Sequence, residues 1–235
     1  KGTSPIASTS GNIGSGSRAS EAPIRFSKEN MIVRSKNNFA NKLAAFALQA
    51  VKNNKDRHEA VQKFMLANDT VTVATEVPVY IKKDDLLHMQ TQLGFEMYKK
   101  NGKGIEKIEN PDDLPRLITG HIDLVQVRNG QIHILDYKPK AAKERPIEQL
   151  TLYAMALSRL TGLRMYCFKC AWFDEKDYFE FFPLHVVYKG RGKRRKARSD
   201  RKHIATKEGV YTLNESRTKV EQIKPVKALI EVGLR

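Results

Sequence analysis

The chain has 235 residues, of which 40% are hydrophobic, so it can bury one sizeable core beside less ordered ends. Its formal net charge of +16 favours a polyanionic partner, and nucleic acid is the commonest of these. The only cysteines, Cys167 and Cys170, exclude a disulfide framework and suit a reducing compartment. A basic protein with no polyanionic partner is the alternative.

The sequence holds no apolar run near the ~20 residues of a membrane-spanning helix, and no signal peptide is apparent. We therefore expect a protein without membrane contact, in the cytoplasm at the nucleoid or in another compartment that contains DNA. The chain begins at Lys1 rather than Met, which is compatible with a fragment or a processed product.

Composition divides the chain into three regions. Residues 1–25 are expected to be a flexible arm, because most of them are Ser, Gly, Thr or other small or polar residues. Residues 26–188 hold the core, and residues 189–235 are a basic segment with a C-terminal extension. The start of this last region is dominated by Lys and Arg, and we expect it to contact nucleic acid, with a solubilising or localisation tail as the alternative. The residues singled out for that contact are Lys193, Arg194, Arg195 and Lys196.

Apolar spacing and turn residues predict the elements of the core. The first half is expected to hold two helices between Asn38 and Asn68, a strand over Thr72–Ile81, a short helix or ordered insertion over Asp84–Tyr98, and a loop over Asn101–Pro115. The second half is expected to hold strands over Leu117–Arg128 and Gln131–Lys138, a helix from Pro146 to about Leu160 that ends at Gly162, and strands over Met165–Phe173 and Tyr178–Tyr188. This order predicts an α/β fold with a central mixed β-sheet flanked by helices.

The most informative feature is a hairpin at Asn129-Gly130. Asn-Gly between two apolar runs strongly indicates a two-residue turn, because both central residues need positive φ. Arg128 then pairs with Gln131. Counting five residues back from one and five forward from the other leads to Asp123 and Asp136. The two aspartates are therefore expected to face each other, with Cβ atoms about 4.5–5.5 Å apart.

The same pairing places His121 opposite Lys138, and alternation along the strands puts all four polar residues on one face. Two facing aspartates beside an apolar layer would repel each other and resist desolvation, so folding alone would not select them. A divalent cation removes that conflict, and hard oxygen ligands suit Mg²⁺ or Mn²⁺. An exposed hairpin end with solvated charges is the alternative, and the apolar flanks count against it.

At these residues the sequence resembles the PD-(D/E)XK nuclease superfamily. Gly120-His121-Ile122-Asp123 resembles its first acidic motif, and Ile134-Leu135-Asp136-Tyr137-Lys138 resembles its second. Gln149-Leu150-x-x-Tyr153-Ala154 resembles the next helix motif of the RecB-like branch, which includes CRISPR adaptation nucleases. The resemblance covers roughly residues 58 to 188, and its three motifs occur in order.

The resemblance implies a restriction-endonuclease-like core that hydrolyses DNA phosphodiester bonds with Mg²⁺ or Mn²⁺. Asp123, Asp136 and the backbone carbonyl of Tyr137 would be metal ligands, and Lys138 would be catalytic. In the RecB-like branch a histidine on an early helix also binds metal, and His58 is the best match here. A surface helix histidine is the alternative reading of His58.

Four further residues are expected to bind nucleic acid or to support the site. Glu76 matches a recurrent strand position of the family, and His121 lies beside the first aspartate. Gln149 and Tyr153 are four residues apart and share a helix face, which in the family looks toward the site and the DNA strand. Ordinary helix packing is the alternative for that pair. Glu59 is a substitute for His58, since some family members use a helix glutamate.

Several RecB-like nucleases carry four cysteines that hold an iron–sulfur cluster. This chain has only Cys167 and Cys170, and on a strand they would point to opposite faces. We therefore expect no iron–sulfur cluster and predict apolar packing for both side chains.

Taken together, the motifs predict a Mg²⁺- or Mn²⁺-dependent deoxyribonuclease, either an exonuclease or a structure-directed endonuclease. Two alternatives stay open. One is a catalytically inactive nuclease-fold module that binds nucleic acid within a larger assembly. The other is a ribosome-associated or structural basic protein, which explains the charge but not the carboxylate pair. The expected partner is DNA of unspecified strand type, and the chain could also form a homo-oligomer.

Overall fold

The computed structural model describes residues 16–101, 104–188, 203–206, 209–213 and 220–222. The chain divides into two compact units, residues 1–190 and residues 191–235. In the second unit an antiparallel sheet is formed by three described strands, β11 (His203–Thr206), β12 (Gly209–Leu213) and β13 (Val220–Gln222). The expected nucleic-acid contacts at Lys193, Arg194, Arg195 and Lys196 lie outside the described residues.

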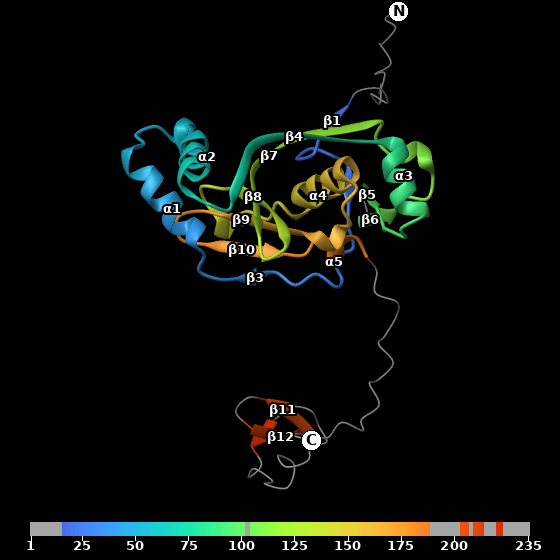
Figure 1. The fold of residues 1–235 in the computed structure, drawn as a ribbon. Helices are drawn as coiled ribbons and strands as arrows, with labels where there is room; N and C mark the ends of the chain where they lie inside the picture. Colours follow the sequence, from blue (N-terminus) through green and yellow to red (C-terminus); the bar gives the residue numbers. More distant parts are fainter. Residues whose placement is uncertain (1–15, 102–103, 189–202, 207–208, 214–219, 223–235) are drawn as a thin grey trace, which may run out of the picture. The chain divides into compact units, whose positions relative to one another are not determined.

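The first unit contains every other element of the described chain (Figure 1). Its strands are β1 (Ser17–Arg18), β2 (Ile24–Arg25), β3 (Arg34–Ser35), β4 (Thr72–Lys82), β5 (Tyr98–Asn101), β6 (Gly104–Lys107), β7 (Leu117–Arg128), β8 (Gln131–Tyr137), β9 (Phe168–Phe173) and β10 (Tyr178–Phe181). Its helices are α1 (Phe39–Ala47), α2 (Arg57–Asn68), α3 (Lys83–Thr91), α4 (Ile147–Thr161) and the single turn α5 (Leu184–Val187).

Within the described part, seven strands form a mixed sheet in the order β1-β7-β8-β9-β10-β3, and β4 pairs with β7 beside this path. Pairing is parallel between β1 and β7 and between β8 and β9, and antiparallel elsewhere. Strands β2, β5 and β6 form a smaller sheet. With helices against the central sheet, this architecture confirms the predicted α/β fold with a restriction-endonuclease-like core.

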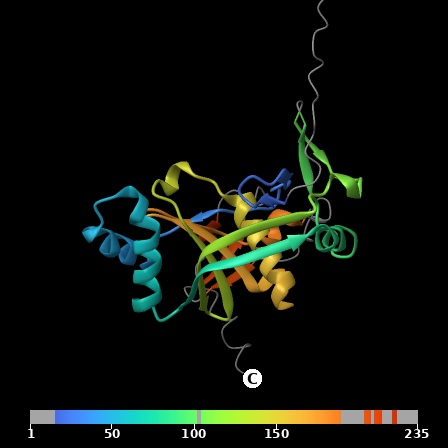
Figure 2. The same cartoon turned by 90° about the horizontal axis from the view of Figure 1, so that it is seen from above.

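Helices cover both faces of the sheet around β8. On one face α4 packs closely enough that the Cys170 thiol donates a hydrogen bond to the Leu150 carbonyl at 3.4 Å. On the other face, side chains of α1 and α2 form a second cluster with Leu124, Leu135 and Tyr137. Figures 1 and 2 show α1 and α2 at one end of this unit and α3, β5 and β6 at the other. Apolar residues on both sides of the hairpin strands are what this double cover requires.

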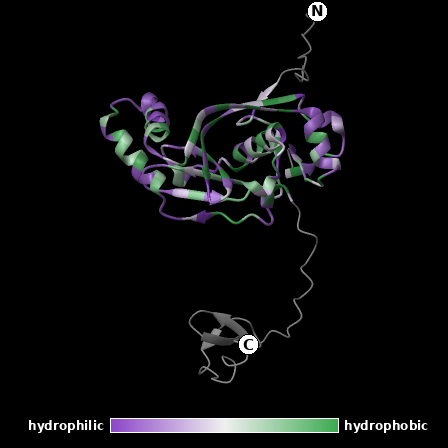
Figure 3. Cartoon of the chain, in the orientation of Figure 1, coloured by the Kyte–Doolittle hydropathy of each residue, from purple (hydrophilic) through white to green (hydrophobic). Residues whose placement is uncertain are grey.

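The helices differ in how much apolar surface they carry. Figure 3 shows that α1 is coloured mostly hydrophobic, whereas α3 is largely hydrophilic. The central helix α4 has eight buried residues and ends at Gly162, whose φ of 73° is the left-handed conformation that glycine adopts most readily. No helix in the described part of the chain is long and apolar enough to cross a membrane.

The hairpin has the geometry that Asn-Gly predicted. Asn129 and Gly130 have φ of 52° and 71°, and Arg128 pairs with Gln131. The antiparallel ladder continues from this turn as far as Leu124 and Leu135. The two-residue turn is therefore confirmed, and it sets the register that brings Asp123 and Asp136 to the same end of the two strands.

Three sequence expectations need correction. The expected loop over Asn101–Pro115 contains β6, which pairs with β5. The expected strand over Tyr178–Tyr188 ends at Phe181, because Pro183 has no N–H for a ladder and instead precedes the helical turn α5. Residues 165–167 form a 3-10 turn before β9, so Cys167 is not on a strand and the argument from opposite strand faces does not hold. Cys170 is fully buried and packs as expected.

The expected flexible arm over residues 1–25 is also corrected in part. Residues 1–15 lie outside the described residues, but Ser17 and Arg18 pair with β7, and Ile24 is fully buried in the core. A two-residue strand is too short to show an alternating pattern, so its order comes from docking on a preformed strand edge and core. Composition alone could not indicate it.

His133 on β8 is a buried histidine that the fold keeps neutral. Its side chain is 3% exposed, and Arg128 donates a hydrogen bond to its Nδ1 at 3.3 Å. Burial, followed by the nearby charges of Arg128 and Lys169, lowers the pKa of His133 from 6.5 to about 3. The folded protein therefore binds fewer protons than the unfolded chain between these two pH values.

The protein should accordingly lose stability on acidification. The contribution of His133 is complete above pH 6.5 and is lost as pH falls toward 3, by roughly 1.4 kcal/mol of unfolding free energy per pH unit. Urea unfolding between pH 7 and pH 4 measures the slope. His133→Gln should flatten it, whereas His88→Gln, a change at an exposed histidine, should not. Equal slopes for His133→Gln and the wild-type chain would exclude this assignment.

Candidate active site

The edge of β7 that faces β8 is left open over four residues. Strand β4 pairs along the other edge of β7, from residue 117 to residue 126. On the facing edge, β8 pairs with residues 124–128 and β1 pairs with residues 118–119. Gly120 to Asp123 therefore lie between two ladders, where the backbone and side chains are accessible to groups from α4 and α2.

Asp123 and Asp136 lie next to each other at this opening. Instead of a backbone ladder bond, the Tyr137 N–H donates to Oδ2 of Asp123 at 3.0 Å. Asp136 is 3% exposed, and its Oδ2 lies 3.0 Å from Nζ of Lys138. Nδ1 of His58, at the start of α2, lies 3.4 Å from Oδ2 of Asp123. The structure thus brings together four residues that the motifs had singled out.

The electrostatics of the pair follow from this crowding. Burial, and next the charge of Asp123, raises the pKa of Asp136 well above its usual range. Burial also opposes ionisation of Asp123, but contacts with His58 and Asp136 outweigh it, so the pKa of Asp123 is lowered. Burial would lower the pKa of Lys138, yet the neighbouring Asp136 raises it. Without a cation, Asp136 therefore keeps its proton to a higher pH than an ordinary carboxyl group does, whereas Asp123 ionises more readily.

The donor set fits a hard divalent cation. Oδ2 of Asp136 is buried, and although Lys138 is close, no donor in the described part of the chain reaches this oxygen with hydrogen-bond geometry. A buried acceptor oxygen without a donor is unusual, and a cation bound beside this oxygen would satisfy it. Among the described residues, no three His, Cys, Asp or Glu side chains are gathered closely enough to hold an ion. A backbone carbonyl and water would complete the shell, which suits Mg²⁺ or Mn²⁺.

Arg57 connects this site to the loop that follows β9, and no motif or spacing pointed to this residue. Its guanidinium donates to the Tyr137 hydroxyl from Nε at 3.2 Å and from Nη2 at 3.0 Å, and it also pairs with Glu175. The Tyr137 ring packs edge-on against the His58 ring, with 5.1 Å between their centroids. Tyr137 therefore links the end of β8 to the start of α2 through its hydroxyl and its ring, and to Asp123 of β7 through its N–H.

Tyr153 packs against the open segment of β7 from α4. Its hydroxyl accepts a hydrogen bond from Nε2 of Gln149 at 2.9 Å, and its side chain is 6% exposed. Its ring lies directly over Gly120, where an added Cβ would be 2.3 Å from Cε1 of the ring. Gly120 is therefore required by the close approach of an aromatic ring. The shared helix face predicted for Gln149 and Tyr153 is directed toward the carboxylate strand.

We expect Gly120→Ala to displace Tyr153 and to destabilise the fold by about 1–3 kcal/mol, as overpacking of a core does. Thermal and urea unfolding measure the loss. The matched control is Gly16→Ala, because a Cβ there meets only ordinary contacts at 3.5 Å. The double variant Gly120→Ala/Tyr153→Ala should lose less than the sum of the single changes, since the clash is gone. Simple additivity would contradict the proposed contact.

The other predicted residues do not join the cluster around Asp123 and Asp136. Glu76 on β4 is exposed and accepts a hydrogen bond from Gln62 of α2, with a φ of 50° that is rare for a residue with a side chain. His121 is exposed and pairs with Pro78, so its predicted pairing with Lys138 does not form. The cause is that the ladder between β7 and β8 ends before these residues, and the N–H of Lys138 donates to β9 instead.

Glu59 does not replace His58 as the helix residue nearest the carboxylates. It is exposed and pairs with Lys63 one turn along α2. Since His58 precedes Glu59 by one position, the two side chains leave the helix in different directions. Only His58 is directed toward Asp123.

Comparison with known proteins gives one positive result. Residues 26–228 match the model of the PD-(D/E)XK nuclease superfamily. A search of curated proteins found no match to the chain.

Proposed function

The chain belongs to the PD-(D/E)XK nuclease superfamily, and from that premise we propose that it hydrolyses phosphodiester bonds of DNA at Asp123 and Asp136 in a metal-dependent reaction. Membership implies nuclease activity in general. The observation that carries the finer proposal is the pair of adjacent, largely buried carboxylates with the Lys138 ammonium 3.0 Å from one of them. Such an arrangement costs stability and is expected where it serves chemistry.

In this proposal Asp123, Asp136 and the backbone carbonyl of Tyr137 would hold Mg²⁺ or Mn²⁺, and His58 would orient the Asp123 carboxylate, whose Oδ2 lies 3.4 Å from its Nδ1. A bound divalent ion supplies Lewis-acid polarisation of the scissile phosphate and a water of lowered pKa. The chain's own part begins with ionisation of both carboxyl groups, because ligands must be ionised to bind a cation. The N–H of Tyr137 keeps the Asp123 carboxylate in place.

Lys138 is proposed to position the attacking water and to stabilise charge in the transition state. Its Nζ lies at the mouth of the carboxylate pair, where it can orient a water and stabilise the negative charge that develops on the phosphate. The loop that follows carries exposed Lys140, Lys143 and Arg145, which we assign to contacts with the DNA backbone. The resemblance of the Gln149–Tyr153 pair to the helix motif of the RecB-like branch supports a place in that branch.

The test is a cleavage assay with labelled linear, circular and branched DNA, with Mn²⁺, with Mg²⁺ and with a chelator. Cleavage should require the metal, and Lys138→Met should reduce it by about 10²-fold or more. The matched control is Lys169→Met, which also removes a half-buried lysine paired with a carboxylate, Glu180, but leaves the site intact. Binding of DNA without any cleavage would instead support an inactive nuclease-fold module.

A further inference from the structure

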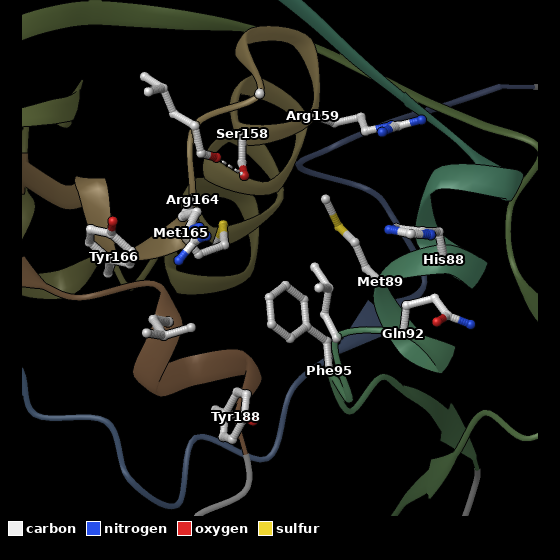
Figure 4. A pocket seen from close by; sticks show the side chains of 14 residues that line it. His88, Met89, Gln92, Phe95, Ser158, Arg159, Arg164, Met165, Tyr166 and Tyr188 are labelled. Atoms are coloured by element: carbon white, nitrogen blue, oxygen red, sulfur yellow. Dashed lines mark hydrogen bonds between the residues drawn. The ribbon is translucent and has the colours of Figure 1, made fainter.

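A groove lies between α3, the C-terminal end of α4 and α5, away from the carboxylate pair. It has a volume of about 760 Å³ and is lined by 14 residues (Figure 4). From one side it is lined by Met89 of α3 and by Phe95, and from the other by Arg164 and Met165 (Figure 4). The site proposed for hydrolysis uses none of these residues.

The groove is apolar inside and basic at its rim. Tyr166 and Tyr188 are 58% and 44% exposed, and the Tyr188 ring packs edge-on against Phe95, with 6.4 Å between the ring centroids. None of the 14 lining residues is Asp or Glu. Arg159 is neutralised by Asp85, but Arg164 is exposed and has no ion-pair partner among the residues that the structure describes. The sequence that follows Tyr188 directly is the Lys- and Arg-rich stretch of residues 189–202.

We propose that this groove binds single-stranded nucleic acid, with bases stacked on Tyr166 and Tyr188 and phosphates held by Arg164. Aromatic rings combined with a cationic rim are the general means of holding a strand with unpaired bases, because every base offers a stacking face. A duplex hides those faces. Because no lining residue is a carboxylate and Arg164 has no ion-pair partner among the described residues, the charge of the groove is complementary to a phosphate backbone rather than to a neutral ligand.

The inference rests on the proposed nuclease function and deepens it by naming the strand type. Helix α4 joins the two places, since Gln149 stands beside the carboxylate strand and Arg159 at the groove. These two residues are ten positions apart on one helix, or about 15 Å along its axis. A strand that occupies the usual site size of roughly 4–16 nucleotides can span that distance. The groove would then hold the strand while the carboxylate pair acts on it.

The test is fluorescence anisotropy of the full chain in chelator, so that binding is measured without cleavage. The probes are an oligothymidylate, an abasic strand of equal length and a blunt duplex. Tyr166→Ala and Tyr188→Ala should each weaken oligothymidylate binding about tenfold, the usual loss for one stacked base. Neither should change binding of the abasic strand. Tyr188→Phe keeps the ring and should bind as the wild-type chain does.

Two controls separate stacking from charge and from general damage. Tyr80→Ala removes a tyrosine of equal exposure, 45%, on β4 outside the groove, and should leave all three affinities unchanged. Arg164→Gln should weaken binding of the abasic strand and of the oligothymidylate alike, and should reduce the slope of log affinity against log salt concentration by about one. Arg116→Gln, a change at an exposed arginine that does not line the groove, should do neither.

Unchanged oligothymidylate affinity in both tyrosine-to-alanine variants would overturn the proposal, as would equal losses for the abasic strand. Either result would point to another occupant, such as a helix of a partner protein. A chain that binds the strand through these rings but cuts no DNA would retain the groove assignment and would refute only the hydrolytic site.

Discussion

Asp136→Asn is expected to abolish metal-dependent cleavage of DNA, with a loss on the order of 10³-fold, while the free energy of unfolding stays the same or rises. The substitution keeps the shape of the side chain but removes the charge that holds the cation. It also removes the free-energy cost of burying an ionised carboxylate and the repulsion between the charges of Asp136 and Asp123. In the wild-type chain these two effects raise the pKa of Asp136. Single-turnover cleavage and urea unfolding measure the two effects.

The matched control for Asp136→Asn is Glu180→Gln. Both carboxylates are 3% exposed, but Glu180 is paired with Lys36 and Lys169 away from the candidate site. We expect Glu180→Gln to lower stability and to leave cleavage unchanged, the reverse of the effect at Asp136. If Asp136→Asn cleaved DNA at the wild-type rate, the carboxylate pair would not be the hydrolytic centre. Asp136→Asn should not change the affinity of the groove for single-stranded nucleic acid.

Tyr137→Phe is expected to raise the Mn²⁺ concentration needed for half-maximal cleavage by about 10-fold to 100-fold, as loss of a group that orients metal ligands does. The variant keeps the backbone N–H that binds Asp123 and the ring that packs on His58. It removes the hydroxyl to which Arg57 donates, so α2 is no longer fixed to the end of β8. Metal titrations at saturating DNA measure the shift.

A second arginine–tyrosine hydrogen bond in the same fold provides the control. Arg128 donates to the hydroxyl of buried Tyr178 at 3.0 Å, on the face of the sheet away from the carboxylates. Tyr178→Phe should cost a similar amount of stability, about 1 kcal/mol for one hydrogen bond, without changing the response to Mn²⁺. A metal response in Tyr137→Phe that matched Tyr178→Phe would show that Arg57 only stabilises the fold and does not position His58.

Both predictions depend on the same property of the site, namely that its charged groups are held in place before substrate binds. Asp123 and Asp136 are kept in an unfavourable electrostatic state, and surrounding contacts limit how they can relax. Arg57 and Tyr137 fix the helix that carries His58, and Tyr153 occupies the space over Gly120 on the other side. Preorganisation of this kind allows charged groups to act on a phosphate without first having to rearrange.

The local parts of this site follow directly from the amino-acid sequence. Asn129-Gly130 dictates the turn, because few other pairs adopt positive φ twice, and the turn sets the register of two strands. From that register alone Asp123 and Asp136 fall at the same strand ends. The order of helices and strands, and Gly162 as the end of α4, followed from spacing and from backbone preferences that act over a few residues.

The contacts between segments distant in the chain arise only when the chain folds. The bond from Arg57 to Tyr137 joins residues 80 positions apart, and no periodicity encodes it. The order of Ser17 and Arg18 depends on an edge of β7 that exists only after folding, and the groove arises where α3, α4 and α5 meet. Such contacts are set by packing and the topology of the sheet, which a one-dimensional pattern does not carry.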